Sequence, residues 1–467
     1  MKKIHLSVAL ALLVTTALSC GTDDGSAELD NGIKAPAEIS LSQDSYSADV
    51  AGGSLKLSVS APERPKATAS DSWIHITDGV YKDYSITVTV SVDANETYSD
   101  REGTVTVTSG THSKSLSVTQ PGQEVPAVQE VNITKTLVTE SPTEKAQALY
   151  HFLLSVYGRK TVSSIMADVN WNTKEAEKVY SAVGKYPAMN CYDFIHIYVP
   201  KNNWIDYSDL TPVTSWHDAG GIVSLMWHFN VPVNKETKPG TDGSGVTCSP
   251  GKTTFKASNA LVDGTWENEW YLQEMGKVAD IILALQEQGI PAIWRPYHEA
   301  AGNSYAKGWN GSAWFWWGAG GADTFKALWR NMFRYFKEKG IRNLIWVWTA
   351  QNYNGNSVSY GNDADYYPGD EYVDVVARDI YGDSPQNDAV EFIELQNRYN
   401  TKMIALGECG HNNDSGVNFP TIPEIWTAGA KWSWFMPWYG STMPDTAWWK
   451  SALSCQDVIT RETLPKL

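Results

Sequence analysis

The sequence is poor in cysteine, and its few cysteines do not form a recognisable metal site. Only five of the 467 residues are cysteines, and their spacing matches no zinc signature. We therefore predict no metal ion and no cofactor. Two of them, Cys191 and Cys409, lie in apolar stretches, so we expect both to be buried free thiols.

Clusters of positive charge are also missing. The formal net charge is −16, and the lysines and arginines are dispersed along the chain. Proteins that bind nucleic acid need a basic patch to contact the phosphates, so we do not expect nucleic acid as a partner. A neutral polysaccharide would be indifferent to the negative charge.

The chain has no long apolar run except near its N-terminus. Two lysines precede an apolar run over residues 6–18, which is too short to span a bilayer as a mature helix. Ser19 and Cys20 follow, and this order resembles a bacterial lipoprotein signal over residues 1–20, with Cys20 as the lipidated residue. We therefore expect a lipid anchor in the cell outer membrane.

The residues that follow this signal indicate where in the cell the protein would be located. The acidic pair Asp23-Asp24 resembles the surface-export signal of some Gram-negative outer-membrane lipoproteins. Residues 21–37 are small, polar and acidic, which is typical of a tether. The alternative is an ordinary secretory signal, which would leave the protein in the periplasm or secreted.

Tryptophan is scarce in the first third of the chain and abundant afterwards. Of 21 tryptophans, only Trp73 lies within the first 150 residues. Aromatic rings stack on the apolar faces of sugar rings much as they stack on one another. We therefore expect a carbohydrate-binding cleft in the rest of the chain, although many of these tryptophans should fill a large core.

Residues 38–121 alternate apolar and polar side chains with a period of two. The alternation is clearest in residues 54–60, 85–92, 103–108 and 114–119. Val, Thr and Ser dominate these runs, and Gly, Asn and Asp interrupt them. The pattern predicts short antiparallel strands in a small immunoglobulin-like β-sandwich.

This stretch resembles a BACON domain. The matching residues are Gly52-Gly53-Ser54, Ser72-Trp73-Ile74, Asn95, Arg101, Gly103-Thr104 and Val118-Thr119-Gln120. The resemblance implies glycan binding, but a single tryptophan makes a poor sugar platform, and we expect Trp73 to fill the sandwich core. We interpret the domain as a spacer, with glycan binding as the alternative.

After a linker at residues 122–137, residues 138–467 alternate apolar runs with helix-like stretches. The expected strands are residues 161–166, 188–194, 221–228, 291–299, 343–351, 373–381, 402–410 and 430–438. Helices are expected between them, for example at residues 267–288, 322–339 and 389–399. Near-continuous apolar strands are typical of a parallel sheet that helices cover. Eight such strands predict an α/β fold, a (β/α)8 TIM barrel behind the all-β domain.

Two glutamates stand at the ends of predicted barrel strands. Glu299 ends the fourth strand, and Glu408 lies near the end of the seventh, 109 positions later (408 − 299). Strand ends carry the chemistry of barrel enzymes, and two carboxyl groups there are what glycosidic-bond cleavage requires. We interpret Glu299 as the acid/base and Glu408 as the nucleophile of a retaining mechanism, provided that the carboxyl groups lie about 5–5.5 Å apart.

Neighbouring residues are expected to set the charge of each glutamate. His298, apolar surface and the other carboxylate would keep Glu299 protonated. Tyr381 is expected to donate a hydrogen bond to Glu408, and Asp379 to hold Tyr381 or a sugar hydroxyl.

The motifs around these glutamates resemble those of glycoside hydrolase family 26. R-P-x-H-E stands at residues 295–299, and G-E-x-G at residues 407–410. W-H-x-x-N is approximated at residues 227–230, D-x-Y stands at residues 379–381, and W-F-W-W-G at residues 314–318. The resemblance implies a retaining glycosidase whose best-known relatives are endo-β-1,4-mannanases.

The resemblance also implies which residues bind the sugars around the cleaved bond. They are His228, Arg295, His298, Trp314, Trp317, Asp379, Tyr381 and Trp438. Trp438 would form the floor under the sugar at the scissile bond. Two loops are expected to shape the cleft, an insertion at residues 303–312 and a long loop at residues 232–255.

We therefore interpret the chain as a monomeric endo-β-1,4-mannanase whose partner is a mannan-type polysaccharide. A β-1,3-1,4-glucanase, a β-1,3-xylanase and an exo-acting enzyme of the same family remain alternatives, because the catalytic residues do not separate them. The alternative from another class is a non-catalytic glycan-binding lipoprotein. Such a protein would be expected to lose Glu299 or Glu408, and both are present.

Overall fold

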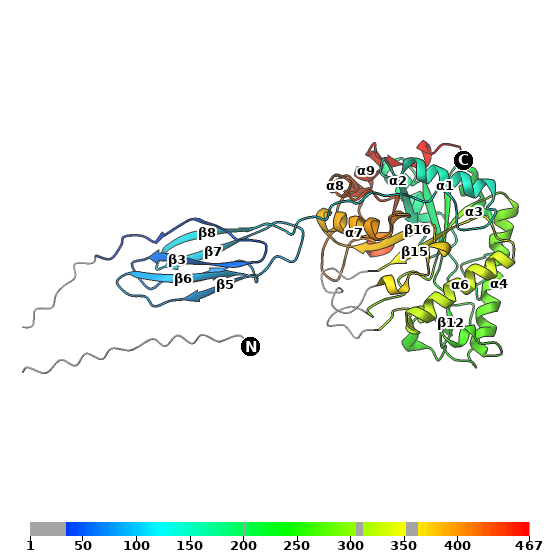
Figure 1. The fold of residues 1–467 in the computed structure, drawn as a ribbon, viewed down its shortest axis with the longest axis horizontal. Helices are drawn as coiled ribbons and strands as arrows, with labels where there is room; N and C mark the ends of the chain where they lie inside the picture. The colour runs from blue at the N-terminus through cyan, green and yellow to red at the C-terminus, as the bar shows by residue number, and fades with distance from the viewer. Residues whose placement is uncertain (1–33, 200, 305–311, 352–362, 467) are drawn as a thin grey trace, which may run out of the picture. The chain divides into compact units, whose positions relative to one another are not determined.

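The computed structural model describes residues 34–199, 201–304, 312–351 and 363–466. This part of the chain forms two compact units, an N-terminal all-β unit and a larger unit of strands and helices (Figure 1). The predicted lipidation site Cys20, the signal and most of the tether lie outside the described residues.

The N-terminal unit is a sandwich of two four-stranded sheets. Its strands are β1 (Ser40–Leu41), β2 (Ser45–Ser47), β3 (Gly53–Ser60), β4 (Lys66–Ala69), β5 (Ile74–Asp78), β6 (Ser85–Val92), β7 (Arg101–Ser109) and β8 (His112–Gln120). One sheet has the order β1-β3-β6-β5 and the other the order β2-β8-β7-β4. Every second side chain of β6 is buried, because alternate residues of a strand face the same side of the sheet. The predicted all-β domain is confirmed.

Trp73 lies outside the sandwich core, contrary to the prediction. The core consists of aliphatic side chains such as Leu57, Val88 and Val107, whereas Trp73 is half-buried just before β5. A Cβ placed on Gly103 would lie 3.0 Å from the Trp73 ring, so the ring covers that glycine. Aliphatic side chains from both sheets fill the narrow interior and leave the large ring at its edge.

The C-terminal unit is a closed barrel of eight parallel strands. They are β9 (Thr161–Met166), β10 (Met189–Asp193), β11 (Ile222–Trp227), β14 (Ala292–Pro296), β15 (Leu344–Ala350), β16 (Val375–Tyr381), β17 (Met403–Gly410) and β18 (Trp434–Pro437). Neighbouring strands pair in this order, and β9 pairs with both β10 and β18, which closes the barrel. A short strand, β19 (Val458–Ile459), lies beside β9. All eight predicted barrel strands are present.

Helices alternate with the strands and cover the barrel (Figure 1). They are α1 (Glu144–Val156), α2 (Lys174–Val183), α3 (Thr211–Asp218), α4 (Trp266–Glu287), α5 (Trp316–Ala319), α6 (Ala322–Glu338), α7 (Pro385–Arg398), α8 (Ile422–Ala428) and α9 (Thr446–Ser454). In α6, buried residues such as Phe325, Leu328 and Met332 recur every three or four positions, so one helix face packs on the sheet. Among the described residues, no helix combines the length and the apolar character needed to cross a lipid bilayer.

Helix α1 closes the amino-terminal end of the barrel. Its Leu149 and Leu153 belong to one buried cluster with residues at the starts of barrel strands, such as Ile222 and Met403. The cluster fills this end of the barrel interior. A ligand would therefore approach from the opposite end, at the carboxyl ends of the strands, where barrel enzymes place their sites.

Two segments predicted as connections have structure of their own. At the end of the predicted linker, the N–H groups of Asn132 and Thr134 donate to the carbonyl oxygens of Asn400 and Thr401. The long loop at residues 232–255 contributes to an antiparallel hairpin of β12 (Val231–Pro232) and β13 (Val246–Thr247). This hairpin follows β11 and so lies at the carboxyl end of the barrel.

Candidate active site

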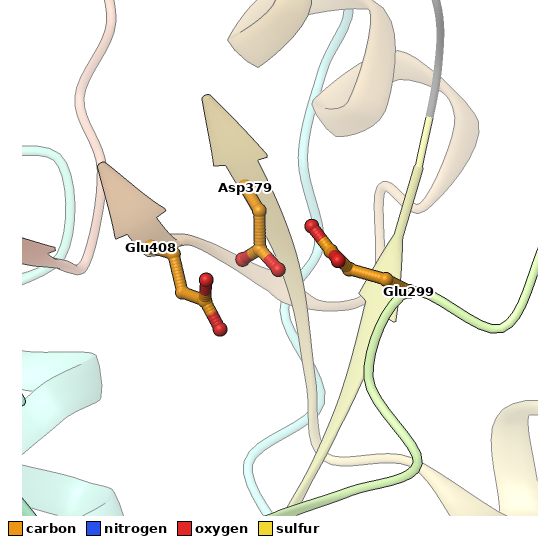
Figure 2. Close-up of side chains that lie close together, drawn as sticks. All are labelled: Glu299, Asp379 and Glu408. Atoms are coloured by element: carbon orange, nitrogen blue, oxygen red, sulfur yellow. The ribbon is translucent and has the colours of Figure 1, made fainter. Parts of the chain in front are cut away.

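Three carboxyl groups converge at the carboxyl end of the barrel. Glu299 follows β14, whereas Asp379 belongs to β16 and Glu408 to β17. Figure 2 shows the three side chains pointing into the same space, with Asp379 between the two glutamates. One oxygen atom of each residue lies within 4.8 Å of the others. The two glutamates predicted from the sequence are therefore brought together.

A shift in strand register places Asp379 beside Glu408. Strands β16 and β17 pair residue by residue as far as Arg378, and the next pair joins Asp379 to Glu408, so that Gly407 is skipped. No larger residue fits at this position, because a Cβ on Gly407 would lie 2.6 Å from Asp379 Oδ1. Gly407 is needed for the close approach of the two strands.

The backbone around Glu299 is strained. The φ angle is +49° at Tyr297 and +51° at Glu299, in the left-handed region that residues with a Cβ rarely adopt. The fourth strand was predicted to extend to Glu299, but β14 ends at Pro296 because a left-handed residue cannot continue a ladder. Each such residue costs on the order of 1–3 kcal/mol, and residues of this kind cluster at functional sites.

Arg295 places a positive charge beneath the carboxyl groups. Its guanidinium forms ion pairs with Asp379, at 3.1 Å between Nη1 and Oδ2, and with Glu408. The resemblance implied that Arg295 binds substrate; in the structure its guanidinium is engaged by the two carboxylates and only 3% of its surface is exposed, and a direct contact with the sugar stays a prediction. Among the described residues, these three carboxylates form the group that could hold a metal ion, yet the guanidinium already supplies the positive charge there.

Both carboxylate oxygens of Glu408 have a hydrogen-bond donor. The Tyr381 hydroxyl donates to Oε2 at 2.7 Å, which confirms the predicted contact, and Arg295 Nη2 donates to Oε1. Burial and the Glu408 carboxylate raise the pKa of Tyr381 well above its usual value, so the hydroxyl keeps the proton that it donates. These two donors fix the orientation of the Glu408 side chain.

The carboxyl group of Glu299 has an unusually high pKa. Burial raises the pKa most, and the carboxylates of Asp379 and Glu408 raise it further, whereas Arg295 lowers it. Both carboxylates disfavour a further negative charge nearby. Glu299 therefore keeps its proton at a higher pH than an ordinary glutamate.

The influence expected of His298 on Glu299 is not found. Burial, followed by His228 and Arg295, holds the pKa of His298 well below its usual range, so the ring is neutral. Only 2% of His298 is exposed. Burial and the carboxylates of Asp379 and Glu408 account for the raised pKa of Glu299, and His298 is not among its causes.

An aspartate that the sequence analysis missed orients His228. Asp193, the last residue of β10, is fully buried. Its Oδ2 lies 2.6 Å from His228 Nδ1, and its Oδ1 accepts the His228 backbone N–H at 3.1 Å. Because Nδ1 is engaged, Nε2 is the ring nitrogen left for another partner. A carboxylate at the end of the second predicted strand was the signal that could have identified Asp193.

In the W-F-W-W-G segment, some rings are buried in the core and others are only half-buried. Trp316 and Trp317 are buried, and Trp317 Nε1 donates to the His298 carbonyl oxygen at 2.9 Å. The prediction that Trp317 binds substrate is therefore wrong, because α5 begins at Trp316 and turns both rings inward. The half-buried Phe315 stacks on Trp317 with centroids 4.4 Å apart and lies 5.9 Å from the His228 ring. The sequence analysis missed Phe315.

Two of the predicted tryptophans, Trp314 and Trp438, are half-buried rather than buried. Trp438 follows β18, and its ring centroid lies 6.0 Å from that of His228. It packs on a small buried cluster of Met166, Cys191, Met226 and Met436. Cys191 in this cluster is a buried free thiol, as is Cys409, which confirms the prediction.

Comparison with protein families gives a match for each unit. The model of glycosyl hydrolase family 26 matches residues 138–460. The BACON model, which describes an N-terminal binding domain, matches residues 62–121. The first match alone covers more than half of the chain.

Curated proteins similar to this chain carry the name mannan endo-1,4-β-mannosidase. The protein of that name from Thermothelomyces thermophilus is 31% identical over 343 residues, which are 71% of this chain and 63% of that protein. Mannan endo-1,4-β-mannosidase B from Piromyces sp is 29% identical over 329 residues, which are 66% of this chain and 48% of that protein. The chain thus spans less than two thirds of the length of these relatives.

Solved structures share the fold. The family 26 domain of an endo-β-mannanase/endo-β-glucanase from Prevotella bryantii matches with a TM-score of 0.69 at 54% identity, covering 71% of this chain and 99% of that one. A β-mannanase from a symbiotic protist of the termite Reticulitermes speratus, solved with a gluco-manno-oligosaccharide, matches with a TM-score of 0.58 at 33% identity, covering 73% and 100%.

Gly407→Ala is expected to disturb the carboxyl cluster, because its Cβ would lie 2.6 Å from Asp379 Oδ1 and 3.5 Å from Arg295 Nη1. We expect the free energy of unfolding, measured by urea denaturation, to fall by about 1–3 kcal/mol. Gly251→Ala is the control, because a Cβ there meets no atom within 4 Å. Equal unfolding free energies for the two variants would contradict the role given to Gly407.

Proposed function

Because the chain belongs to glycosyl hydrolase family 26, we propose that it is a retaining endo-β-1,4-mannanase. Its substrates would be mannan, galactomannan or glucomannan. The names of the two curated relatives support this substrate class. The gluco-manno-oligosaccharide held by the termite-protist enzyme supports it as well.

The distance between the two glutamates is the observation that carries the retaining mechanism. An oxygen of Glu299 and an oxygen of Glu408 lie within 4.8 Å of each other. Retaining glycosidases hold their two carboxyl groups about 5–5.5 Å apart, whereas inverting ones need about 6.5–9.5 Å to admit a water molecule. The short distance favours direct attack on the sugar by one of the carboxylates.

In the first step, a carboxylate oxygen of Glu408 forms a bond to the anomeric carbon of the sugar. The glycosidic C–O bond breaks, and the leaving oxygen takes the proton of Glu299. Two donors, Arg295 and Tyr381, hold Glu408, and they bind a charged carboxylate more strongly than a neutral acid. Glu408 is therefore ready as a nucleophile, while the raised pKa of Glu299 keeps the acid protonated.

In the second step, Glu299 takes a proton from water while the water oxygen attacks the anomeric carbon. The ester bond to Glu408 breaks, and the sugar leaves with its original configuration. The ester carries no negative charge, so one of the causes that raise the Glu299 pKa is absent during this step. The same residue can then act first as an acid and afterwards as a base.

The surrounding residues bind the sugar at the cleaved bond. His228 has Nε2 left for a sugar hydroxyl because Asp193 engages Nδ1. The half-buried rings of Trp438 and Phe315 both lie near the His228 ring, with centroids 6.0 and 5.9 Å from its own. Aromatic faces and a few polar groups are the usual lining of a small-molecule site.

Two other functions use the same residues. A β-1,3-1,4-glucanase or a β-1,3-xylanase of this family would break its bond by the same two steps, so only the substrate decides among them. A glycan-binding protein without activity is the alternative from another class. It is disfavoured because Glu299 and Glu408 are both present and lie within 4.8 Å of each other, joined by a shared neighbour, Asp379.

The purified protein is expected to release reducing ends from β-mannan and galactomannan and to produce oligosaccharides of several lengths. Mixed-linkage β-glucan and β-1,3-xylan are measured beside them. Glu408→Ala should abolish turnover but still bind oligosaccharide in calorimetry, because it removes only the nucleophile. The control is Glu269→Ala, an exposed position on α4, which should keep full activity.

The outcomes separate the hypotheses. Activity on the glucan or the xylan alone would keep the two glutamates and replace the substrate. A single short product would indicate exo attack. If Glu408→Ala kept most of its activity, the nucleophile would be wrongly assigned, and binding without turnover in the wild type would favour the non-catalytic alternative.

Glu299→Ala should lower kcat/KM on mannan by roughly 10²–10⁴-fold, the usual contribution of general acid catalysis. On an aryl β-mannobioside, kcat/KM should fall far less, because the aryl leaving group does not need a proton. In the wild type, kcat/KM should fall as the pH rises through the raised pKa of Glu299, since the acid is then ionised. The variant should lack this alkaline fall. Equal losses on both substrates would count against Glu299 as the acid.

We further propose that Cys20 anchors the protein in the outer membrane, with the BACON-like domain as a spacer. The proposal is supported by the lipoprotein-like signal in the sequence. Cys20→Ala should move the protein from the membrane fraction to the soluble fraction of a Gram-negative host, as measured by fractionation and blotting. Retention of the variant in the membrane fraction would rule out anchoring through Cys20.

A further inference from the structure

Trp204 is an exposed tryptophan in a chain that buries most of its tryptophans. It lies in the loop between β10 and α3, and 48% of its surface is exposed. Single exposed apolar side chains are ordinary on protein surfaces, so exposure alone says little. The surroundings of Trp204 say more, because they hold the ring in a fixed place.

The ring of Trp204 is held from within its own loop. Asn202, which is 8% exposed, accepts the backbone N–H groups of Trp204 at 3.1 Å and of Ile205 at 2.8 Å. The ring stands at 88° to the ring of His196, with centroids 4.9 Å apart. His196 Nδ1 in turn lies 2.9 Å from the Tyr198 hydroxyl. Burial lowers the pKa of His196, so the ring that supports Trp204 is neutral near pH 7.

A second loop supports the ring from the β12–β13 hairpin. The Asn203 N–H donates to the Thr241 carbonyl oxygen at 3.1 Å. Gly243 has φ +84°, and a Cβ there would lie 3.4 Å from the Trp204 ring. Beside it, the exposed carboxylate of Asp242 is held by Ser244, whose N–H and hydroxyl both donate to Oδ1. Ser244 therefore orients the carboxylate of Asp242, the residue next to Gly243, and Oδ2 can accept further hydrogen bonds.

This platform is connected to the candidate active site. Asp193 ends β10 and holds His228, and its carbonyl oxygen accepts the Tyr207 hydroxyl at 2.8 Å. Tyr207 in turn accepts the His196 N–H at 3.2 Å. Three residues span at most about 11 Å, so His196 lies within that reach of Asp193, at the same end of the barrel as Glu299. The platform is therefore within reach of a polysaccharide chain that is bound at the glutamates.

We propose that Trp204, supported by His196 and with Asp242 in the neighbouring loop, is a distal subsite that binds a sugar of the polysaccharide chain away from the cleaved bond. The ring offers an apolar face to a pyranose, and Asp242 offers an acceptor to its hydroxyl groups. The combination of a flat aromatic face with a few fixed polar groups suits a neutral sugar. This inference rests on the proposed function, because it takes the ligand to be the same polysaccharide.

The test compares a long and a short substrate. We measure kcat/KM of the full protein on β-1,4-mannohexaose, which reaches beyond the central sugars, and on 4-nitrophenyl β-1,4-mannobioside, which does not. Trp204→Ala should lower kcat/KM on the hexaose by roughly three- to tenfold, as expected for the loss of one stacking contact, and leave the short substrate unchanged. Trp204→Phe keeps an aromatic face and should retain most of the activity on the hexaose.

Tyr180 provides a matched control. It is 43% exposed and lies near the end of α2, which runs back toward the amino-terminal end of the barrel, away from the glutamates. Its ring stacks on Tyr186 with centroids 4.2 Å apart, so it is also a supported, exposed aromatic. Tyr180→Ala should leave kcat/KM on both substrates unchanged. This result would show that removing an exposed aromatic ring far from the site does not affect turnover.

The outcomes decide the proposal. An unchanged kcat/KM on the hexaose in Trp204→Ala, or an equal loss on both substrates, would overturn the subsite. If the wild type cleaves mixed-linkage β-glucan instead of mannan, the proposed substrate fails but the subsite can still be tested, with long and short β-glucan oligosaccharides in the same variants. Calorimetry with the hexaose in a Glu408→Ala background gives an independent readout, in which adding Trp204→Ala should weaken binding by the same factor.

Discussion

The buried guanidinium of Arg295 is the group on which the rest of the site depends. It forms ion pairs with Asp379 and Glu408. Burial lowers the pKa of the guanidinium, but the two carboxylates raise that pKa by more, so Arg295 stays positively charged. One positive charge cannot balance three carboxylates within 4.8 Å of one another, so a proton must remain in the cluster. Because Asp379 and Glu408 contact the guanidinium directly, the proton is best placed on Glu299. The difference between the two glutamates thus follows from charge balance.

The sequence was sufficient to predict the barrel and the pair of glutamates, because both signals are local. An apolar run followed by a polar residue marks a strand and its carboxyl end, and β9 was predicted with the bounds that the structure gives. Depth in the fold is not a local property. Arg295 and Trp317 stand in the same motifs as the half-buried Glu299 and Phe315, yet β14 and α5 turn their side chains into the interior. Asp193 was missed for the related reason that its role depends on a partner, His228, which follows another strand, β11.

The abundance of tryptophan illustrates the same distinction. Composition correctly separated the barrel from the sandwich, but it could not say which rings bind sugar. Most of them, including Trp227, Trp294 and Trp329, fill the space between strands and helices. The rings that matter for the cleft are those which strand ends and loops leave partly uncovered. Packing across the whole unit decides which rings these are, and local patterns in a single sequence do not show it.

The left-handed backbone at Tyr297 and Glu299 has a consequence for engineering. Tyr297 is buried and its hydroxyl contacts that of Tyr271 at 3.2 Å, so the surrounding fold imposes the strained conformation. Replacing either residue with glycine would relieve the strain and so raise the stability at that position, because glycine tolerates a left-handed backbone better than any other residue. Glycine at position 299 would remove the catalytic acid. Glycine at position 297 would make the segment that positions Glu299 more flexible. Heat resistance in this barrel should therefore be sought in the helices that cover it, away from the carboxyl ends of the strands.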